Sequence, residues 1–398
     1  TRYISVTGVQ TCALPISVQI LTSMSGTTGS VLAPVAAPAL AVPTYLVGVY
    51  VGIIYGVSAC SSAACSGFIA RFGAVRISQI CMLLCAAGLS LGALGQVWSA
   101  VASALIIGIA YGPSPVSSSH ILARLTPPSW MNLVFSAKQT GVPIGTGLSG
   151  LLLPTLAIAF GWQGAALIVA TLCVVVALAI QPLHRSLDTD RDPSRTLFAL
   201  ASLSSAVRFV LDDPEMRRLS IISFAYAGMQ TILSAFLVTY LSSRVGMAIV
   251  LAGFVLAISQ ASGAIARIVW GFTCDKGGVD PVRLLAGLGI AMSVIAVITG
   301  FFSPDWPFAL IVVVCAAFGV TAAGWNGVFL AQLARLAPGR VSEAAGGSHL
   351  ATFGGVMVLP PVFSLILGIT GSYAIGFICI AALTLAGGVW LLLPLRRA

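Results

Sequence analysis

Residues 122–127 read Leu-Ala-Arg-Leu-Thr-Pro, and residues 333–338 read Leu-Ala-Arg-Leu-Ala-Pro. The second stretch begins 211 positions after the first (333 − 122), and each follows a long apolar run. A sequence that recurs at a fixed offset indicates an internal duplication. The chain is therefore predicted to consist of two halves that share one architecture.

The composition predicts a membrane protein. Of the 398 residues, 58% are apolar and only 7% are charged, and the mean hydropathy is +1.06, whereas soluble proteins carry about 25% charged residues. A membrane span needs about 20 apolar residues. We predict an all-α membrane protein with twelve transmembrane helices in two six-helix, pseudo-symmetric halves, which excludes a soluble enzyme.

Charged, Pro-rich and Gly-rich breaks divide the apolar sequence into these helices. The predicted ranges are 18–39, 44–66, 77–96, 98–121, 131–160 and 162–183 in the first half, and 217–242, 246–272, 284–303, 306–335, 347–370 and 372–395 in the second.

The breaks define four segments. Residues 1–17 resemble translated sequencing-adapter read-through and are expected to be non-native. Residues 18–183 form the N-terminal half, 184–215 a cytoplasmic linker and 216–398 the C-terminal half. The linker carries dense charge and is expected to be solvated, with an interfacial helix or plain coil between its residues 197 and 210.

The positions of Lys and Arg predict the orientation, because cytoplasmic loops retain basic residues. Arg244 alone lies in the opposite loops. Both termini and the linker are predicted to be cytoplasmic, in a bacterial inner membrane. The net charge of +9 therefore reflects topology, and no nucleic-acid partner is expected. The basic residues on the cytoplasmic side are Arg71, Arg76, Arg124, Lys276, Arg283, Arg335, Arg340, Arg396, Arg397 and those of the linker.

One loop carries a recognisable motif. Residues 270–278, after the eighth helix, read Trp-Gly-Phe-Thr-Cys-Asp-Lys-Gly-Gly. This resembles the Gly-x-x-x-Asp-Arg/Lys-x-Gly signature of the major facilitator superfamily, matched by Gly271, Asp275 and Lys276. The resemblance covers residues 18–398 and implies that Asp275 and Lys276 form a cytoplasmic latch between helices.

A degenerate copy of the motif follows the second helix. Residues 66–73 read Ser-Gly-Phe-Ile-Ala-Arg-Phe-Gly, so Arg71 and Gly73 match the signature while Ala70 replaces its Asp. The latch of the N-terminal half is therefore in doubt. An ordinary hairpin with a surface ion pair is the alternative for either loop.

Glycine and proline mark two further helices. Gly141, Pro143 and Gly145 resemble a run in bacterial carriers of the superfamily and, distantly, an antiporter signature; close helix packing is the default interpretation. In the fourth helix Pro113 and Pro115 interrupt backbone hydrogen bonds, which is tolerated at membrane depth only where protein or water satisfies them.

Three basic or titratable residues lie within predicted helices, where charge is costly and suggests function. They are Lys138, Arg267 and His349, and the offset of 211 relates Lys138 to His349 (349 − 138). For Lys138 and Arg267 the alternative is snorkelling to the membrane surface or a local ion pair. For His349 it is a buried, hydrogen-bonded imidazole rather than a proton relay.

The acidic residues indicate the charge of the solute. All ten Asp and Glu lie at or beyond Asp188, and no carboxylate is expected inside a span. Basic groups without acidic ones favour an anion, and Arg267 can bind a carboxylate bidentately. Arg267 and Gly271 also resemble the helix-8 segment of the oxalate/formate antiporter and monocarboxylate carriers, where a basic residue binds the substrate carboxylate.

The resemblance implies that helices 1, 4, 7 and 10 line a central cavity. Tyr111 in helix 4, Tyr226 and Gln230 in helix 7, and Trp325 and Asn326 in helix 10 are the candidates. Polar packing between helices is the alternative.

These features favour a secondary transporter that works by alternating access as a monomer in the lipid bilayer. The predicted solute is a small organic anion, a mono- or dicarboxylate, moved with a proton or a counter-anion as symporter or antiporter. Efflux of drugs or hydrophobic compounds is the alternative. No motif indicates a membrane enzyme, a receptor or a scaffold. The nine cysteines include no Cys-x-x-Cys pair, so neither a metal nor a cofactor is expected.

Overall fold

The computed structural model describes residues 6–126, 134, 138–189, 191–192, 201–275, 277–338 and 340–394. These residues form helices and connecting loops without a β-strand, which confirms the predicted all-α fold class. The chain divides into two compact units, unit 1 (Thr1–Ala41 and Ile53–Leu200) and unit 2 (Val42–Gly52 and Ala201–Ala398). The division falls inside the predicted linker, but Val42–Gly52, predicted in the first half, packs with unit 2.

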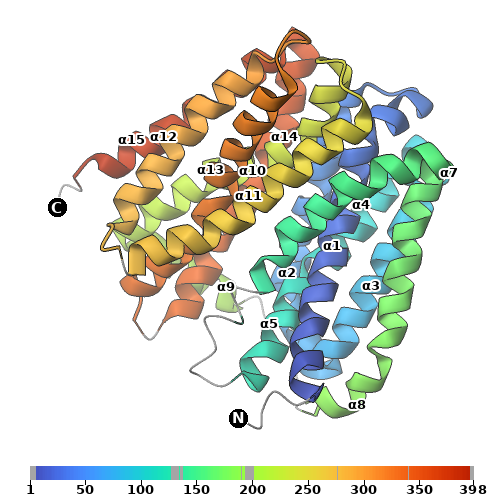
Figure 1. Ribbon diagram of the computed structural model, residues 1–398. Helices are drawn as coiled ribbons and strands as arrows, with labels where there is room; N and C mark the ends of the chain where they lie inside the picture. The colour runs from blue at the N-terminus through green and yellow to red at the C-terminus, as the bar shows by residue number, and fades with distance from the viewer. Residues whose placement is uncertain are drawn as a thin grey trace. The chain divides into compact units, whose positions relative to one another are not determined.

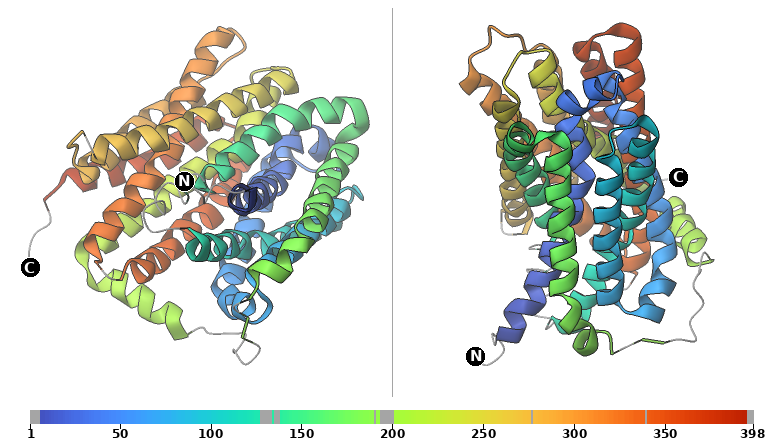
Figure 2. Two further views of the ribbon diagram at one scale, coloured as in Figure 1. Left: turned by 60° about the horizontal axis from the view of Figure 1, so that its bottom comes forward. Right: turned by 90° about the vertical axis from the view of Figure 1, so that its right-hand side faces the viewer.

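Unit 1 is built from helices that pack along one another. α1 runs beside the long α7, and α3 packs against both α4 and α7, as Figure 2 shows. Its elements are α1 (Val6–Ala39), most of α2 (Val47–Phe72), α3 (Ala74–Gly92), α4 (Val97–Tyr111), α5 (Pro113–Leu125), α7 (Gly141–Ala179), η3 (Gln181–Leu183) and α8 (His184–Leu187).

Three predicted helices of unit 1 differ from the sequence interpretation. The range 98–121 is divided into α4 and α5 at Gly112, since Pro113 has no N–H to continue the ladder. The ranges 131–160 and 162–183 are continuous in α7, but Gly161 (φ 74°, ψ 163°) is non-helical and separates two arms that meet in a turn, visible in Figure 1. Residues 131–133 and 135–137 lie outside the described residues.

Unit 2 packs as three principal helix pairs: α11 with α13, α12 with α15, and α10 with α14. Its elements are η1 (Thr44–Leu46), α9 (Ala201–Asp212), α10 (Pro214–Ser243), α11 (Ile249–Asp275), α12 (Pro281–Gly300), α13 (Phe308–Leu336), α14 (Val341–Thr370) and α15 (Tyr373–Leu392).

Asp-Pro pairs start two of these helices. Asp213 caps α10 by accepting from the Met216 amide at 2.8 Å, and Asp280 caps α12 by accepting from Val282 and Arg283 at 2.8 and 3.0 Å. The following proline takes the first helical position, where its missing N–H has no helical partner to lose. Local sequence therefore determines where both helices begin.

Ten helices of the described chain are long and apolar enough to cross a membrane. One of the ten, Val97–Leu125, joins α4 and α5, and another, Gly141–Leu187, includes both arms of α7. α1, predicted as the span 18–39, is not among the ten. The chain is a multi-pass membrane protein, while the number of twelve spans stays a prediction.

Candidate functional site

The Lys138 side chain is buried in unit 1. It is only 3% exposed, and its Nζ donates to the Pro115 carbonyl at 2.6 Å and to Ser119 Oγ at 2.7 Å. Both partners belong to α5 and neither is charged. The snorkelling interpretation requires the ammonium to reach the surface, and it does not. The ammonium instead ties the segment before α7 to α5.

One of these partners, the Pro115 carbonyl, lies in the first turn of α5, just after the helix break. Pro113 and Pro115 stand at the start of α5, and Gly112 lies so close to α2 that a Cβ there would overlap Ser61 and the Ser58 carbonyl. The Pro115 carbonyl accepts from both Ser119 Oγ, at 2.8 Å, and Lys138. The Pro115 carbonyl is therefore shared between a hydroxyl and a buried cation.

Tyr111, at the end of α4, lies in an aromatic pair. Its ring contacts Tyr55 of α2 edge to face with centroids 5.1 Å apart, and the Tyr55 hydroxyl donates to the Tyr111 hydroxyl at 3.4 Å. Tyr111 is 8% exposed. Sequence reasoning missed Tyr55, whose only signal was its position in an otherwise Gly- and Ser-rich helix.

The glycines at the start of α7 face α1. Gly141 lies against Gln19, and a Cβ at Gly145 would overlap the Ile20 carbonyl, while Pro143 is buried in the first turn. Their small size allows the two backbones to approach closely. This placement agrees with the interpretation that these residues allow close packing of two helices.

Arg267, on α11 of unit 2, points to α13. Its Nε donates to the Ala323 carbonyl at 2.8 Å, and the side chain is half-buried. Asn326 is three residues further along α13, about 4.5 Å at 1.5 Å per residue. Asn326 therefore lies within one helical turn of the carbonyl that Arg267 binds.

Gln230 completes this polar region of unit 2. Asn326 Nδ2 donates to Gln230 Oε1 at 3.2 Å, and both side chains are half-buried. Gln260 Nε2 donates to Ser234 Oγ at 3.0 Å, and Ser234 donates to the Gln230 carbonyl at 3.1 Å. Sequence reasoning missed Gln260 and Ser234, although Ser234 is four residues from Gln230.

Tyr226 and Trp325 belong to the core of unit 2. Each is 1% exposed, and their rings meet edge to face with centroids 5.8 Å apart. The Tyr226 hydroxyl donates to the Leu285 carbonyl at 3.0 Å. These contacts agree with the alternative of packing between helices. Neither side chain is exposed enough to contact a solute in this structure.

His349, in α14, has an exposed ring. Its Nδ1 lies 2.5 Å from the Ala345 carbonyl, and the ring neighbours Phe353. The alternative of a buried imidazole is wrong for this residue.

The helix-8 loop motif is only partly visible. Lys276 lies outside the described residues, and Asp275 is described only as the last residue of α11. Gly271 is inside α11, and a Cβ there would meet nothing within 4 Å. Gly278, after the helix, has a positive φ of 65°. The latch between Asp275 and Lys276 stays a prediction.

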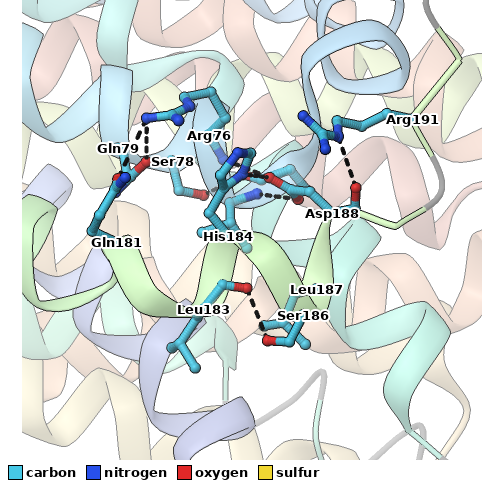
Figure 3. Close-up of polar contacts among 12 residues, drawn as sticks. Arg76, Ser78, Gln79, Gln181, Leu183, His184, Ser186, Leu187, Asp188 and Arg191 are labelled. Atoms are coloured by element: carbon cyan, nitrogen blue, oxygen red, sulfur yellow. Dashed lines mark hydrogen bonds and ion pairs between the residues drawn. The ribbon is translucent and has the colours of Figure 1, made fainter.

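The degenerate motif lies next to Asp188, an acid that the sequence analysis expected to be exposed to solvent. Arg71 is exposed, and Gly73 (φ 95°) precedes α3. Asp188, expected in a solvated linker, is only 1% exposed and accepts hydrogen bonds from the Val75 and Arg76 amides, as Figure 3 shows. Its one sequence signal was a histidine four residues earlier.

Each unit contains a basic side chain with N–H donors. Unit 1 holds a buried ammonium with uncharged partners, and unit 2 contains a half-buried guanidinium and a hydrogen-bonded pair of side-chain amides. Among the described residues no group of three or more His, Cys, Asp or Glu could hold a metal ion.

Known proteins resemble the chain in sequence and in fold. An uncharacterized MFS-type transporter of Mycobacterium tuberculosis (strain CDC 1551 / Oshkosh) is 27% identical over 186 residues. That match spans 46% of this chain and 40% of the relative, so the chain matches well under half of the relative's length. The counterpart in strain H37Rv gives the same values.

Solved structures share the fold at low identity. A bacterial homologue of the human lysosomal transporter Spinster, inward-facing and occupied, superposes with a TM-score of 0.72 at 17% identity, covering 96% of this chain and 95% of that one. A peptide transporter POT in complex with sulfate gives 0.72 at 16%, covering 96% and 94%. Residues 16–354 match the Major Facilitator Superfamily as a family. The chain therefore belongs to the Major Facilitator Superfamily.

Proposed function

We propose that the protein is a secondary transporter that moves a small organic anion, a mono- or dicarboxylate, across the bacterial inner membrane by alternating access. The observations that carry this proposal are the half-buried Arg267 guanidinium and, in the same unit, the hydrogen-bonded amides of Asn326 and Gln230. Charged and neutral N–H donors suit carboxylate oxygens, which only accept.

The distribution of acids supports an anion over a cation. Of the ten acidic residues, Glu215 alone lies in one of the ten candidate spans, as the second residue of Pro214–Ser243. A cationic solute lacks a buried carboxylate to bind in these spans. Lys138 adds a second positive charge, in unit 1, whose bonded partners are uncharged.

Arg267 and Lys138 have different parts in this proposal. Arg267 is half-buried and contacts the solute, whereas Lys138 is 3% exposed and holds the segment before α7 against α5. Lys138 contributes mainly long-range attraction. A proton or a counter-anion accompanies the solute, and both termini and the linker lie in the cytoplasm.

Uptake into proteoliposomes tests the proposal. We expect the purified protein to take up at least one of ¹⁴C-labelled formate, oxalate, lactate and succinate. Arg267→Gln should lower that uptake by roughly 10- to 100-fold, the equivalent of ~1.5–3 kcal/mol for hydrogen bonds to a charged group. The matched control is Arg283→Gln at the exposed start of α12, which should change uptake by less than about twofold. Equal uptake by wild type and Arg267→Gln contradicts the assignment.

Efflux of hydrophobic compounds is the second candidate, favoured by the Tyr55–Tyr111 pair in unit 1. The faces of tyrosine rings attract cations. Ethidium export that depends on Tyr55 and Tyr111, without uptake of any carboxylate in the panel, supports this candidate over the first.

A further inference from the structure

Asp188, at the beginning of the predicted linker, is hydrogen-bonded to the start of α3. Its carboxylate accepts from the Val75 amide at 2.8 Å and the Arg76 amide at 3.0 Å, and His184 donates to it through Nδ1 at 2.8 Å. Figure 3 shows the carboxylate between the start of α3 and the His184 ring. A carboxylate that is 1% exposed persists only where such donors replace water.

The first turn of α3 needs this acceptor. The initial N–H groups of a helix have no partner within the helix, and a carboxylate there is further stabilised by the helix dipole. Gly73, the residue before α3, has no side chain to cap it. A Cβ at Gly73 would overlap the Asp188 carboxyl group. The missing side chain thus leaves the space that an acid from a distant part of the chain fills.

Other contacts hold the same linker segment against further elements. Arg124, at the end of α5, donates through Nη1 to the Leu187 carbonyl at 3.0 Å, and the Asp192 amide donates to the Ala70 carbonyl of α2 at 2.9 Å. Arg191 Nε donates to the Asp188 carbonyl at 2.9 Å. Residues 187–189 and 191–192 therefore connect the ends of α2, α3 and α5.

Arginine side chains from three elements lie around this segment. Arg76 comes from α3 and hydrogen-bonds Gln79 and Gln181, Arg124 comes from α5, and Arg191 comes from the linker. Asp188 is the buried acid of this segment, which also contains the half-buried Asp192. Removal of the Asp188 carboxylate leaves the buried Val75 amide and the part-buried Arg76 amide without their acceptor.

We propose that Asp188 is a positioning residue for transport. Its carboxylate joins the α2–α3 junction, the end of α5 and the start of the linker into one rigid piece that moves as a unit during the transport cycle. The role in the cycle rests on the proposed function, whereas the anchor itself does not.

Hydrogen exchange measured by mass spectrometry tests the anchor directly. In Asp188→Asn, which keeps the size of the side chain but places an NH₂ group against an amide donor, peptides covering 74–80 and 187–192 should both lose protection by about tenfold or more. The matched control is Asp212→Asn in α9, where the acid forms an exposed pair with Arg208 at 3.9 Å. That variant should leave both peptides unchanged. Unaltered protection in Asp188→Asn overturns the anchor.

Transport kinetics test the role. With the carboxylate that wild type takes up fastest, Asp188→Asn should lower kcat by about tenfold and leave KM within about twofold, since the change affects a step after binding. Raised KM at unchanged kcat, or normal kinetics despite lost protection, overturns the role in transport. If wild type takes up no carboxylate, the proposed function fails while the exchange measurement still decides the anchor. Asp188→Ala serves as a second variant where it folds.

Discussion

In unit 1 neighbouring helices are joined by hydroxyl pairs, such as Ser78 with Ser117 at 3.1 Å. Unit 2 has similar pairs, such as Ser293 with Thr384 at 2.7 Å, but it adds an aromatic cluster. The cluster contains Phe236, Tyr240, Phe302, Phe363, Tyr373 and Phe377.

The described part of unit 1 has the pairs Tyr55–Tyr111 and Phe68–Phe72 and no comparable cluster. The two halves that the repeat predicts to be alike therefore share their polar contacts and differ in their apolar ones. Packing is the main force that joins helices within lipid, so we expect unit 2 to be the more resistant to unfolding.

The largest effect should come from the aromatic cluster. Phe363→Ala removes a ring that is fully buried and lies 4.6 Å from Phe236 and 5.1 Å from Phe377, centroid to centroid. We expect unfolding to become easier by about 2–3 kcal/mol, less than the ~3–5 kcal/mol of soluble cores because lipid also solvates the ring in the unfolded state. SDS titration of the purified protein measures this. Phe254→Ala, at an exposed position of α11, is the control, and equal losses contradict the cluster's importance.

Removing a tyrosine hydroxyl should lower the free energy of unfolding by a smaller amount, and by more in unit 2 than in unit 1. Tyr226→Phe removes a bond of 3.0 Å to the Leu285 carbonyl and should lower the free energy of unfolding by about 1 kcal/mol. Tyr55→Phe removes a bond of 3.4 Å in unit 1 and should have less effect. Denaturation curves of the two variants compare them, and a larger loss for Tyr55→Phe reverses the expected order.

The smallest effect should come from the hydroxyl pairs, whose coupling energies we expect to be equal in the two units. Double-mutant cycles to alanine at Ser78 with Ser117, and at Ser293 with Thr384, should each give a coupling energy of about 0.6 kcal/mol, the average for polar contacts in membranes. Unequal coupling energies show that the shared hydroxyl pairs also differ between the units.

Much of the fold was predictable from local sequence. Apolar runs located the helices, and Asp213-Pro214 and Asp280-Pro281 determined where two of them begin. The position of Gly161 between two predicted ranges anticipated the turn within α7. The continuity of α7 could not be predicted, because a single left-handed glycine reverses the chain with no intervening loop residues.

The candidate site was less predictable. The basic residues Lys138 and Arg267 stood out because charge is rare in apolar helices, but their partners are carbonyls, at Pro115 and Ala323. Every residue has a carbonyl, so sequence gives no signal for such a partner. Tyr226 and Trp325 are aromatic at helical spacing, which is equally typical of a core and of a cavity wall.

Composition and periodicity by themselves determined that this is an all-helical, multi-pass membrane protein with a duplicated plan, because a span leaves a long, uniform signal in the sequence. Only the tertiary structure decided that Asp188 is buried at the start of α3 rather than solvated. A hydrogen bond between residues 113 positions apart depends on where the backbone amides of another helix lie, and that position is set by the packing of the whole unit.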